Sequence, residues 1–463
     1  MRMDRRHFLV NSGVGLGALA LGTMTAPAGA ATPRLRRPPA KRVIYLFQAG
    51  APSQIDLFED KPKVRKHAGE DLRKHVRMKR VTGMTSGQST YPISPGYFKY
   101  RRHGESGFAF SSLLPETAKI ADRLTFVRSL YSDHVNHDPA LTFFQTGHQF
   151  PGRPSFGSWL SYGLGTLNRN LPDFMVLVSK GDMDAAQPLL ARHWGAGFLP
   201  GRHAGVKLRA GREAVLFLDE PSGQTVEDEA ASLEAIRALN ARHHARTGNP
   251  EVLTRMAQYE MSARMQASVP DLLDFADEPE STWKLYGKEA SKPGTYAYNC
   301  LLARRMAERD VRFVQLYHMG WDHHSSLKRD IAKQCRETDR GSAALVVDLQ
   351  RRGLLDDTIV IWGSEFGRTV YSQGLKRESA GRDHHPYCFT YWLAGGGLKP
   401  GTSFGETDDF GYHITEDKTD VHDLHATLLH QLGIDHERLT FRYQGRDYRL
   451  TDVHGKVIRP ILA

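Results

Sequence analysis

Strand-like apolar runs alternate with helical stretches along most of this chain of 463 residues. The runs lie at residues 42–47, 124–127, 174–178, 311–317 and 358–362. Short, largely apolar runs of this kind are typical of parallel strands that are buried on both faces. Because strands that alternate with helices form βαβ units, the sequence predicts an α/β fold with a mostly parallel central sheet flanked by helices.

Two segments depart from this alternation. Residues 220–291 are charged and rich in helix-forming patterns, with few strand-like runs, so we expect a helical insertion or cap on the sheet. Residues 439–463 alternate apolar and polar positions and contain Gly445 and Gly455, which predicts a small C-terminal hairpin. Residues 42–463 are therefore expected to form one α/β domain.

The N-terminal 30 residues have the pattern of a twin-arginine signal peptide. Arg5 and Arg6 precede an uncharged, Gly/Ala-rich apolar stretch at residues 10–25, and an A-x-A cleavage site follows at residues 28–30. The apolar stretch is shorter than the roughly 20 residues that span a bilayer, which favours cleavage over a stable membrane anchor. Residues 31–41 are expected to be a linker. We therefore expect the twin-arginine translocase to export the protein to the periplasm or beyond.

Charge and cysteine content exclude some classes of protein. The formal net charge is +10, but the basic residues are scattered and form no stripe with interleaved aromatic residues, so nucleic-acid binding is not predicted. A basic surface helps to attract anionic substrates. The three cysteines show no CxxC spacing, and an odd number excludes a disulfide scaffold. Oligomeric state is not predicted.

Polar clusters lie beside three of the C-terminal strand-like runs. One cluster, at residues 321–324, follows residues 311–317, and a second, at residues 364–368, follows residues 358–362; the third, at residues 382–385, precedes an apolar run at residues 389–393. Loops at the carboxyl ends of parallel strands line the ligand crevice of an open α/β sheet. These clusters contain the carboxylates and imidazoles that bind divalent cations, so they predict a metal-dependent site.

The predicted metal ligands are Asp56, Asp322, His324, Glu365 and His384. Asp322 and His324 are two residues apart, so both can face one cation from an extended loop. Other roles remain open, because Asp322 or Asp56 could cap a helix. Glu365 could instead form an ion pair with Arg368. The mixed oxygen and nitrogen ligand set favours Zn²⁺ or Mn²⁺, with Ca²⁺ or Mg²⁺ as alternatives.

Residues 132–139 supply the candidate catalytic histidines. They follow the run at residues 124–127 and precede a helix that begins near Pro139, and a helix N-terminus favours anionic groups. His137 is the candidate nucleophile or general base, and His134 or His385 is the candidate general acid. Arg368 is the candidate for holding the anionic group of a substrate with its forked donors.

These motifs together resemble the exported bacterial proteins known as domain of unknown function 1501, which are related to the alkaline phosphatase and sulfatase superfamily. The stretches that carry the resemblance are residues 49–56, 320–324, 363–368, 381–384 and 422–429. The resemblance covers residues 42–463. It implies a central mixed sheet and a metal-assisted attack on a phosphate or sulfate ester.

The chain departs from the superfamily pattern at two positions. Residues 365–367 occupy the place of an Asp-His-Gly triplet, so Phe366 replaces a histidine that binds metal in the superfamily. Counting back from Thr146 puts His137 where a sulfatase has the cysteine that becomes formylglycine. The resemblance therefore implies neither the usual two-metal phosphatase site nor a formylglycine sulfatase.

The sequence favours an exported, metal-dependent hydrolase of phosphate or sulfate esters. The expected substrate is an anionic small molecule or a polysaccharide ester. The alternative is a non-catalytic protein that keeps the same fold and binds sulfated or phosphorylated polymers.

Overall fold

The computed structural model describes residues 38–79, 81–179, 181, 187, 189–209, 226–374, 376 and 378–463. The expected signal peptide, at residues 1–30, and residues 31–37 of the expected linker lie outside this part of the chain. None of the described helices combines the length and the apolar character needed to cross a bilayer.

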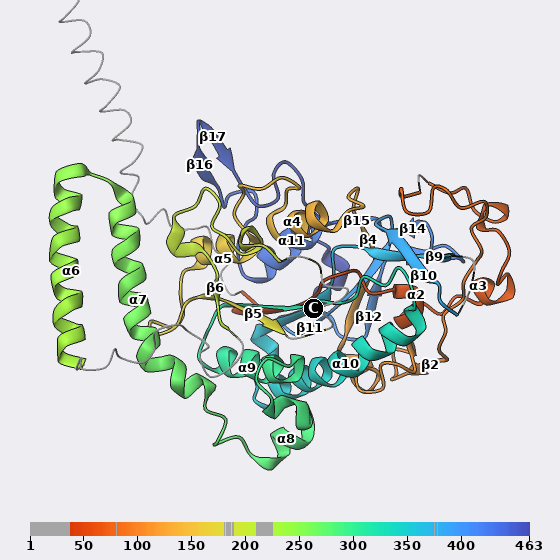
Figure 1. The fold of residues 1–463 in the computed structure, drawn as a ribbon, viewed down its shortest axis with the longest axis horizontal. Coiled ribbons are helices and arrows are strands. Elements are labelled where there is room, and N and C mark those ends of the chain that lie inside the picture. The colour runs from red at the N-terminus through yellow and green to blue at the C-terminus, as the bar shows by residue number, and fades with distance from the viewer. Residues whose placement is uncertain are drawn as a thin grey trace, which may run out of the picture.

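A mixed sheet forms the centre of the described part of the chain (Figure 1). Its strands are β1 (Arg42–Gln48), β4 (Thr125–Tyr131), β5 (Phe174–Ser179), β6 (Val206–Lys207), β7 (Phe313–His318), β8 (Thr358–Gly363), β11 (Phe389–Ala394), β12 (Thr402–Phe404) and β15 (Thr419–Asp420). The order is β12-β4-β11-β8-β1-β7-β5-β6, and β15 also pairs with β4. Only β11 runs antiparallel to its neighbours in this sheet, so the prediction of a mostly parallel sheet is confirmed.

Helices cover both faces of the sheet (Figure 1). One layer contains α4 (His137–Thr146), α5 (Phe156–Leu164) and α11 (Val421–Gln431), and the other contains α9 (Tyr296–Glu308) and α10 (Leu327–Arg351). The alternation of side chains along β1 explains the two layers. Val43, Tyr45 and Phe47 pack in the apolar core beneath α4, α5 and α11. Ile44 and Leu46 pack in the core beneath α9 and α10.

Helices dominate the region where the sequence predicts an insertion. Helices α6 (Val226–Thr247) and α7 (Pro250–Leu273) pack against each other and extend away from the sheet (Figure 1), and α8 (Glu280–Tyr286) follows them. At the other end of the chain, β16 (Phe441–Tyr443) and β17 (Arg446–Tyr448) pair antiparallel as the predicted hairpin.

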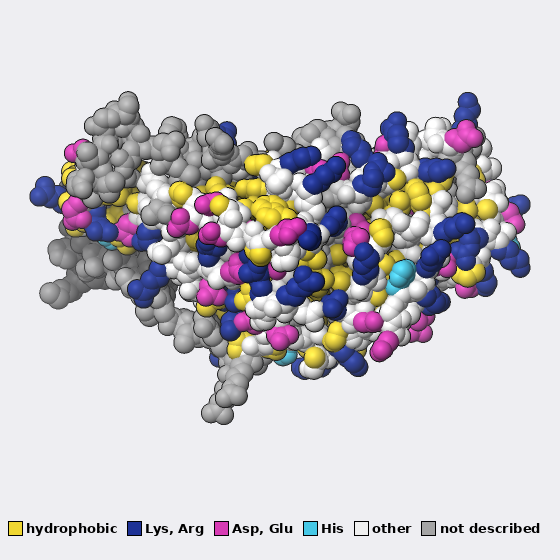
Figure 2. Space-filling view, turned by 90° about the horizontal axis from the view of Figure 1, so that it is seen from below, with side chains coloured by type: hydrophobic (Ala, Val, Ile, Leu, Met, Phe, Trp, Pro, Cys, Tyr) yellow, Lys and Arg dark blue, Asp and Glu magenta, His cyan; other side chains and the backbone are white. Residues whose placement is uncertain are grey.

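Smaller elements surround the sheet. They are α2 (Gln54–Leu57), α3 (Pro62–Lys66), β2 (Tyr100–His103), β3 (Phe108–Ser111), β9 (Gly367–Gln373), β10 (Gly381–His385), β13 (Glu406–Thr407) and β14 (Ile414–Glu416). The three cysteines are buried and unpaired. On the face drawn in Figure 2, Lys and Arg side chains are spread among Asp and Glu rather than gathered in one stripe.

One predicted loop is a strand. Gly381 and Pro386 flank residues 382–385 and favour a loop there, but these residues form β10, which pairs antiparallel with β9. The register shifts between Arg382 and His384. Because successive side chains of a strand point to opposite faces, the two histidines point in different directions.

Candidate metal centre

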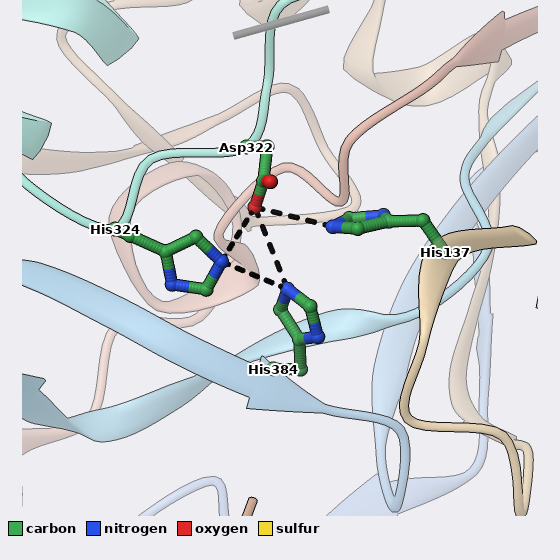
Figure 3. Close-up of side chains that lie close together, drawn as sticks. All are labelled: His137, Asp322, His324 and His384. Carbon is green, nitrogen blue, oxygen red and sulfur yellow. Dashed lines mark hydrogen bonds and ion pairs between the residues drawn. The ribbon is translucent and has the colours of Figure 1, made fainter. Parts of the chain in front are cut away.

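Four side chains from three separate segments converge on one point (Figure 3). His137 is the first residue of α4, Asp322 and His324 lie in the loop after β7, and His384 lies on β10. The Oδ1 atom of Asp322 lies 3.2 Å from Nε2 of His137, 2.9 Å from Nε2 of His324 and 3.4 Å from Nε2 of His384. The three imidazoles therefore face one carboxylate oxygen with the same ring atom.

The other ring nitrogen of each histidine has its own partner. Nδ1 of His137 lies 2.6 Å from a carboxylate oxygen of Glu365. Nδ1 of His384 lies 2.6 Å from the carbonyl oxygen of Val135, and Nδ1 of His324 lies 2.6 Å from the side-chain oxygen of Gln373. Carbonyl and carboxylate oxygens only accept hydrogen bonds, so Nδ1 carries the proton. In the neutral imidazoles, each Nε2 then presents a lone pair to the centre.

Facing lone pairs of this kind fit a bound cation. The Nε2 atoms of His324 and His384 lie only 3.0 Å apart. Nε2 of His137 is buried and has no hydrogen-bond partner in the described part of the chain. A tetrahedral Zn²⁺ with bonds of roughly 2.0–2.1 Å places its ligand atoms about 3.3 Å apart, close to the spacing seen here. Three imidazoles with outer partners and one carboxylate are also a suitable donor set for such an ion.

Glu365 supports the centre from behind His137. It is fully buried, and its Oε1 atom also accepts the backbone N–H of Gly50 at 2.8 Å. Its Oε2 atom accepts the hydroxyl of Ser364 at 2.5 Å. Burial would raise the pKa of Glu365, but the hydrogen bond and charge of His137, together with the hydrogen bond from Ser364, outweigh burial and lower it. Glu365 therefore stays ionised and orients His137, and it lies outside the group of four converging side chains.

Each carboxylate oxygen of Asp322 accepts a hydrogen bond from another side chain. Its Oδ1 atom accepts a hydrogen bond from Nη2 of Arg368 at 2.6 Å, and its Oδ2 atom accepts one from the amide of Gln187 at 2.7 Å. Burial would raise the pKa of Asp322, but the three histidines and Arg368 hold it far below its usual range. The carboxylate is therefore negatively charged whenever the protein is folded at neutral pH.

Two glycines permit the close approach of the segments that carry these residues. A side chain at Gly50, which has φ +111°, would put its Cβ 2.7 Å from the backbone nitrogen of Asp322. A Cβ at Gly381 would lie 2.1 Å from the backbone carbon of His324. Both spaces are too small for a methyl group, so the loops after β1 and β7 and the start of β10 can meet only with glycine at these positions.

The electrostatics differ among the histidines. Burial lowers the pKa of His384 to about 4, with a further contribution from the positive charge of Arg368. Burial would also lower the pKa of His137, but its contacts with Asp322 and Glu365 outweigh burial and raise it. His324 has the most exposed side chain of the four, at 20%, so the centre opens to solvent on its side.

Two predicted residues lie in a buried ion pair or network instead of facing an open site. Asp56 and Arg382 are both fully buried, with Nε of Arg382 2.7 Å from Oδ2 of Asp56. Ser53 also donates to Asp56 at 2.6 Å. Asp56 is thus outside the converging group.

Arg368, predicted to hold a substrate anion, is 1% exposed. Its guanidinium donates to the carbonyls of Gly50, Ala51 and Arg382 as well as to Asp322.

The two candidate general acids also lie apart from the four side chains. Nε2 of His385 contacts the carbonyl oxygen of Tyr412 at 2.9 Å, on the other face of β10 from His384. His134 packs edge-on against Phe143, with ring centroids 4.8 Å apart. Neither histidine contacts the centre.

Some residues of the site carry no signal in the sequence. Gln187, Gln373 and the carbonyl of Val135 act through tertiary contacts that spacing along the chain does not indicate. The ring of Phe366 packs against His137 and His384, with centroids 4.8 and 4.6 Å apart. Phe366 thus forms an apolar wall of the centre, at the position where the superfamily resemblance expects a metal ligand.

Comparison with solved structures finds only distant likeness. Similar structures include a phosphonate monoester hydrolase from Silicibacter pomeroyi (11% identity, 91% of this chain, 76% of that chain, TM-score 0.36). Another is a protein in the alkaline phosphatase superfamily from Vibrio parahaemolyticus (10% identity, 89% of this chain, 72% of that chain, TM-score 0.38). A third is a sulfatase from Pseudoalteromonas sp. (13% identity, 91% of this chain, 71% of that chain, TM-score 0.36). Likeness at these scores carries no conclusion about activity.

Sequence comparison is more decisive for the family than for the function. No protein of curated function matches the chain at a significant level. The family described as "Protein of unknown function (DUF1501)" matches residues 40–462, which is nearly the whole described chain, and the protein belongs to that family.

Proposed function

We propose that the protein is an exported, metal-dependent hydrolase of phosphate or sulfate esters, with one divalent cation bound at the centre formed by His137, Asp322, His324 and His384. The observation that carries the proposal is the convergence of three imidazole Nε2 atoms on one carboxylate oxygen, with every Nδ1 of the three already paired. Neutral imidazoles would repel one another across 3.0 Å without a proton or cation between them. The nitrogen-rich donor set favours Zn²⁺ or Mn²⁺ over Ca²⁺ or Mg²⁺.

A cation bound there would polarise an ester oxygen and lower the pKa of a water molecule. The residues of the chain prepare the site for an anionic ester. Asp322 contributes the one negative charge among the four side chains, and Arg368 compensates it from behind. The N-terminus of α4 lies at the site because His137 is its first residue, and its backbone N–H groups favour an anionic group nearby.

His137 has three candidate roles that use the same atom. Its Nε2 lone pair can complete the ligand set, or it can accept a proton as a general base or attack as a nucleophile. The buried carboxylate of Glu365 supports each role, because it fixes the Nδ1 proton and raises the basicity of Nε2. The affinity of a His137→Ala variant for the cation separates the roles: loss of binding assigns a ligand, and retained binding with lost turnover assigns a base or nucleophile.

The test of the function begins with the metal. The purified protein is analysed for Zn, Mn, Ca and Mg, then stripped with a chelator and titrated with each ion. Aryl phosphates, phosphate diesters and aryl sulfates are assayed with the bound metal present. One equivalent of metal and turnover of at least one ester class are expected, and Asp322→Asn should abolish both. Asp356→Asn, at an exposed carboxylate in the turn before β8, serves as the matched control.

A protein that neither contains a divalent metal nor gains one on titration would overturn the proposal. Export is tested separately, by following the cellular location of the full chain and of a variant in which Arg5 and Arg6 are both replaced by Lys.

One observation favours the second candidate, a non-catalytic protein that binds sulfated or phosphorylated polymers. In the described part of the chain, no Ser, Thr or Cys side chain hydrogen-bonds to any of the four converging residues, and Phe366 closes one side. Such a centre offers no hydroxyl or thiol nucleophile. His137→Ala distinguishes the candidates, because an enzyme loses turnover while a binder shows none in the wild type and changes only modestly in affinity.

A further inference from the structure

A second cluster of metal-binding side chains lies outside the candidate centre, on residues 67–75. It consists of His67, Glu70 and His75, whose nitrogen and oxygen atoms lie within 4.8 Å of one another. Nδ1 of His67 is 3.1 Å from Oε1 of Glu70, and Nε2 of His75 is 2.9 Å from Oε2. The two imidazoles thus face the opposite oxygens of a single carboxylate, with their ring centroids 4.3 Å apart.

The fold fixes the ring of His75 and the backbone that carries the cluster. The ring of His75 stacks on Phe410 with centroids 5.2 Å apart, and Phe410 is 6% exposed. The backbone of Glu70 is fixed because its carbonyl accepts the N–H of Ile93 at 2.8 Å. Leu72, which is fully buried, packs in the same small apolar core as Phe410. The cluster therefore sits on a packed segment with a fixed backbone, which limits the backbone entropy lost when a ligand binds.

Charge around the cluster is compatible with a cation although the segment is basic. Three of the nearby basic side chains are paired with carboxylates of their own: Lys63 with Asp409, Arg65 with Asp60 and Arg73 with Asp71. Among the described side chains, those within ion-pair distance of Glu70 are His67 and His75. The Glu70 carboxylate therefore pairs with the two imidazoles, whereas Lys63, Arg65 and Arg73 pair with other carboxylates.

We propose that His67, Glu70 and His75 form a second site for a divalent transition-metal ion, with Zn²⁺ as the probe of choice. Two imidazoles and one carboxylate are a known three-ligand set for zinc, and water supplies the remaining position. The three ligands come from one short segment, so the bound ion ties His67 to His75 and fixes the stretch between them, whose backbone pairs with Tyr91 and Ile93. This site does not depend on the chemistry of the candidate centre.

The experiment counts bound zinc in the full chain by equilibrium dialysis against Zn²⁺ and elemental analysis. Wild type is compared with His67→Ala/His75→Ala, with Glu70→Gln, and with His384→Ala to empty the candidate centre. His430→Ala, a half-buried histidine on α11, is the matched control. The double variant should bind one zinc fewer than wild type. Glu70→Gln should weaken that zinc by more than ~10-fold, since loss of even an outer partner of a ligand costs roughly that much.

Two further results separate this site from the proposed function. His384→Ala should retain the zinc of the second site, and the double variant should retain ester turnover. Zinc should also slow hydrogen exchange at the amides of Leu72 and Ile93 in the His384→Ala chain, and this effect should vanish when His67 and His75 are also replaced. Equal zinc content in wild type and the double variant, or unchanged exchange at both amides, would overturn the second site and leave the candidate centre unaffected.

Discussion

Glu365 lies directly behind His137, with its Oε1 atom 2.6 Å from Nδ1 of the imidazole and 2.8 Å from the backbone nitrogen of Gly50. A buried carboxylate in this position fixes the tautomer of the histidine and turns its Nε2 lone pair toward Asp322. The pair thus connects the end of β8 to the start of α4 through one hydrogen bond.

Replacing this carboxylate by an amide is expected to weaken the centre without removing a ligand. Glu365→Gln keeps the shape and one acceptor but loses the negative charge that makes Nε2 of His137 basic. The affinity for Zn²⁺ should fall about 10–100-fold, the usual effect of losing an outer partner of a histidine ligand. Competition with a chelator measures it. Glu59→Gln, a buried glutamate bonded to Thr390 and Thr407, is the control, and equal affinities in both variants would contradict the assignment.

Asp56 is expected to matter for stability and not for metal binding. Asp56→Asn leaves the fully buried guanidinium of Arg382 without its charge partner. Breaking a buried pair on one side costs about 3–5 kcal/mol, which urea unfolding should reveal as a lower midpoint with an unchanged slope. Zinc stoichiometry should stay at the wild-type value. Loss of one equivalent in a folded Asp56→Asn chain would instead make Asp56 a ligand.

Arg368 is expected to organise the site from within. Its guanidinium connects the carbonyls of Gly50 and Ala51 to Asp322, and lysine cannot make all of these contacts with its single ammonium. Arg368→Lys should destabilise the fold by about 2–3 kcal/mol, because buried carbonyls lose their donors. Turnover should fall mainly through kcat at saturating metal. A variant with wild-type stability but a strongly raised KM would contradict this role and would support the prediction that Arg368 holds the substrate anion.

Acid is expected to destabilise the protein through histidines that are buried in neutral form. Burial lowers the pKa of His318 to about 4 and that of His425 to about 3, and neither residue belongs to the candidate centre. Below pH 6.5 the unfolded chain binds a proton on each histidine, while the folded chain does not until about pH 3–4. Stability is therefore complete above pH 6.5 and is lost as the pH falls toward 4.

The size of this effect follows from the pKa shift. Between pH 6.5 and 4, each histidine should contribute roughly 3–4 kcal/mol, at about 1.4 kcal/mol per pKa unit. Denaturant titrations of the metal-free protein at pH 7, 6, 5 and 4 measure it, with His318→Gln expected to flatten the dependence. Stability that is constant from pH 7 to 4 would show that these imidazoles are not buried in neutral form.

The local pattern of the chain is enough to predict much of the architecture. Continuous apolar runs such as residues 42–47 identify strands buried on both faces, and their alternation with helices dictates a mostly parallel sheet with helices on each side. Loops at the carboxyl ends of those strands are then the place for a site, which is why Asp322 and His324 stand out before any coordinates are known. The hairpin at β16 and β17 also follows from local alternation.

Only the tertiary structure decides which polar residues share the site and which are buried in pairs. From the sequence, Asp56, Glu365 and Asp322 are equivalent carboxylates near strand ends. In the fold, Asp56 pairs with Arg382, Glu365 supports His137, and Asp322 faces the three imidazoles. The difference arises because a carboxylate's role depends on the cation or donor that packing brings within about 3 Å, and, apart from His324, those partners are 62–326 residues away along the chain.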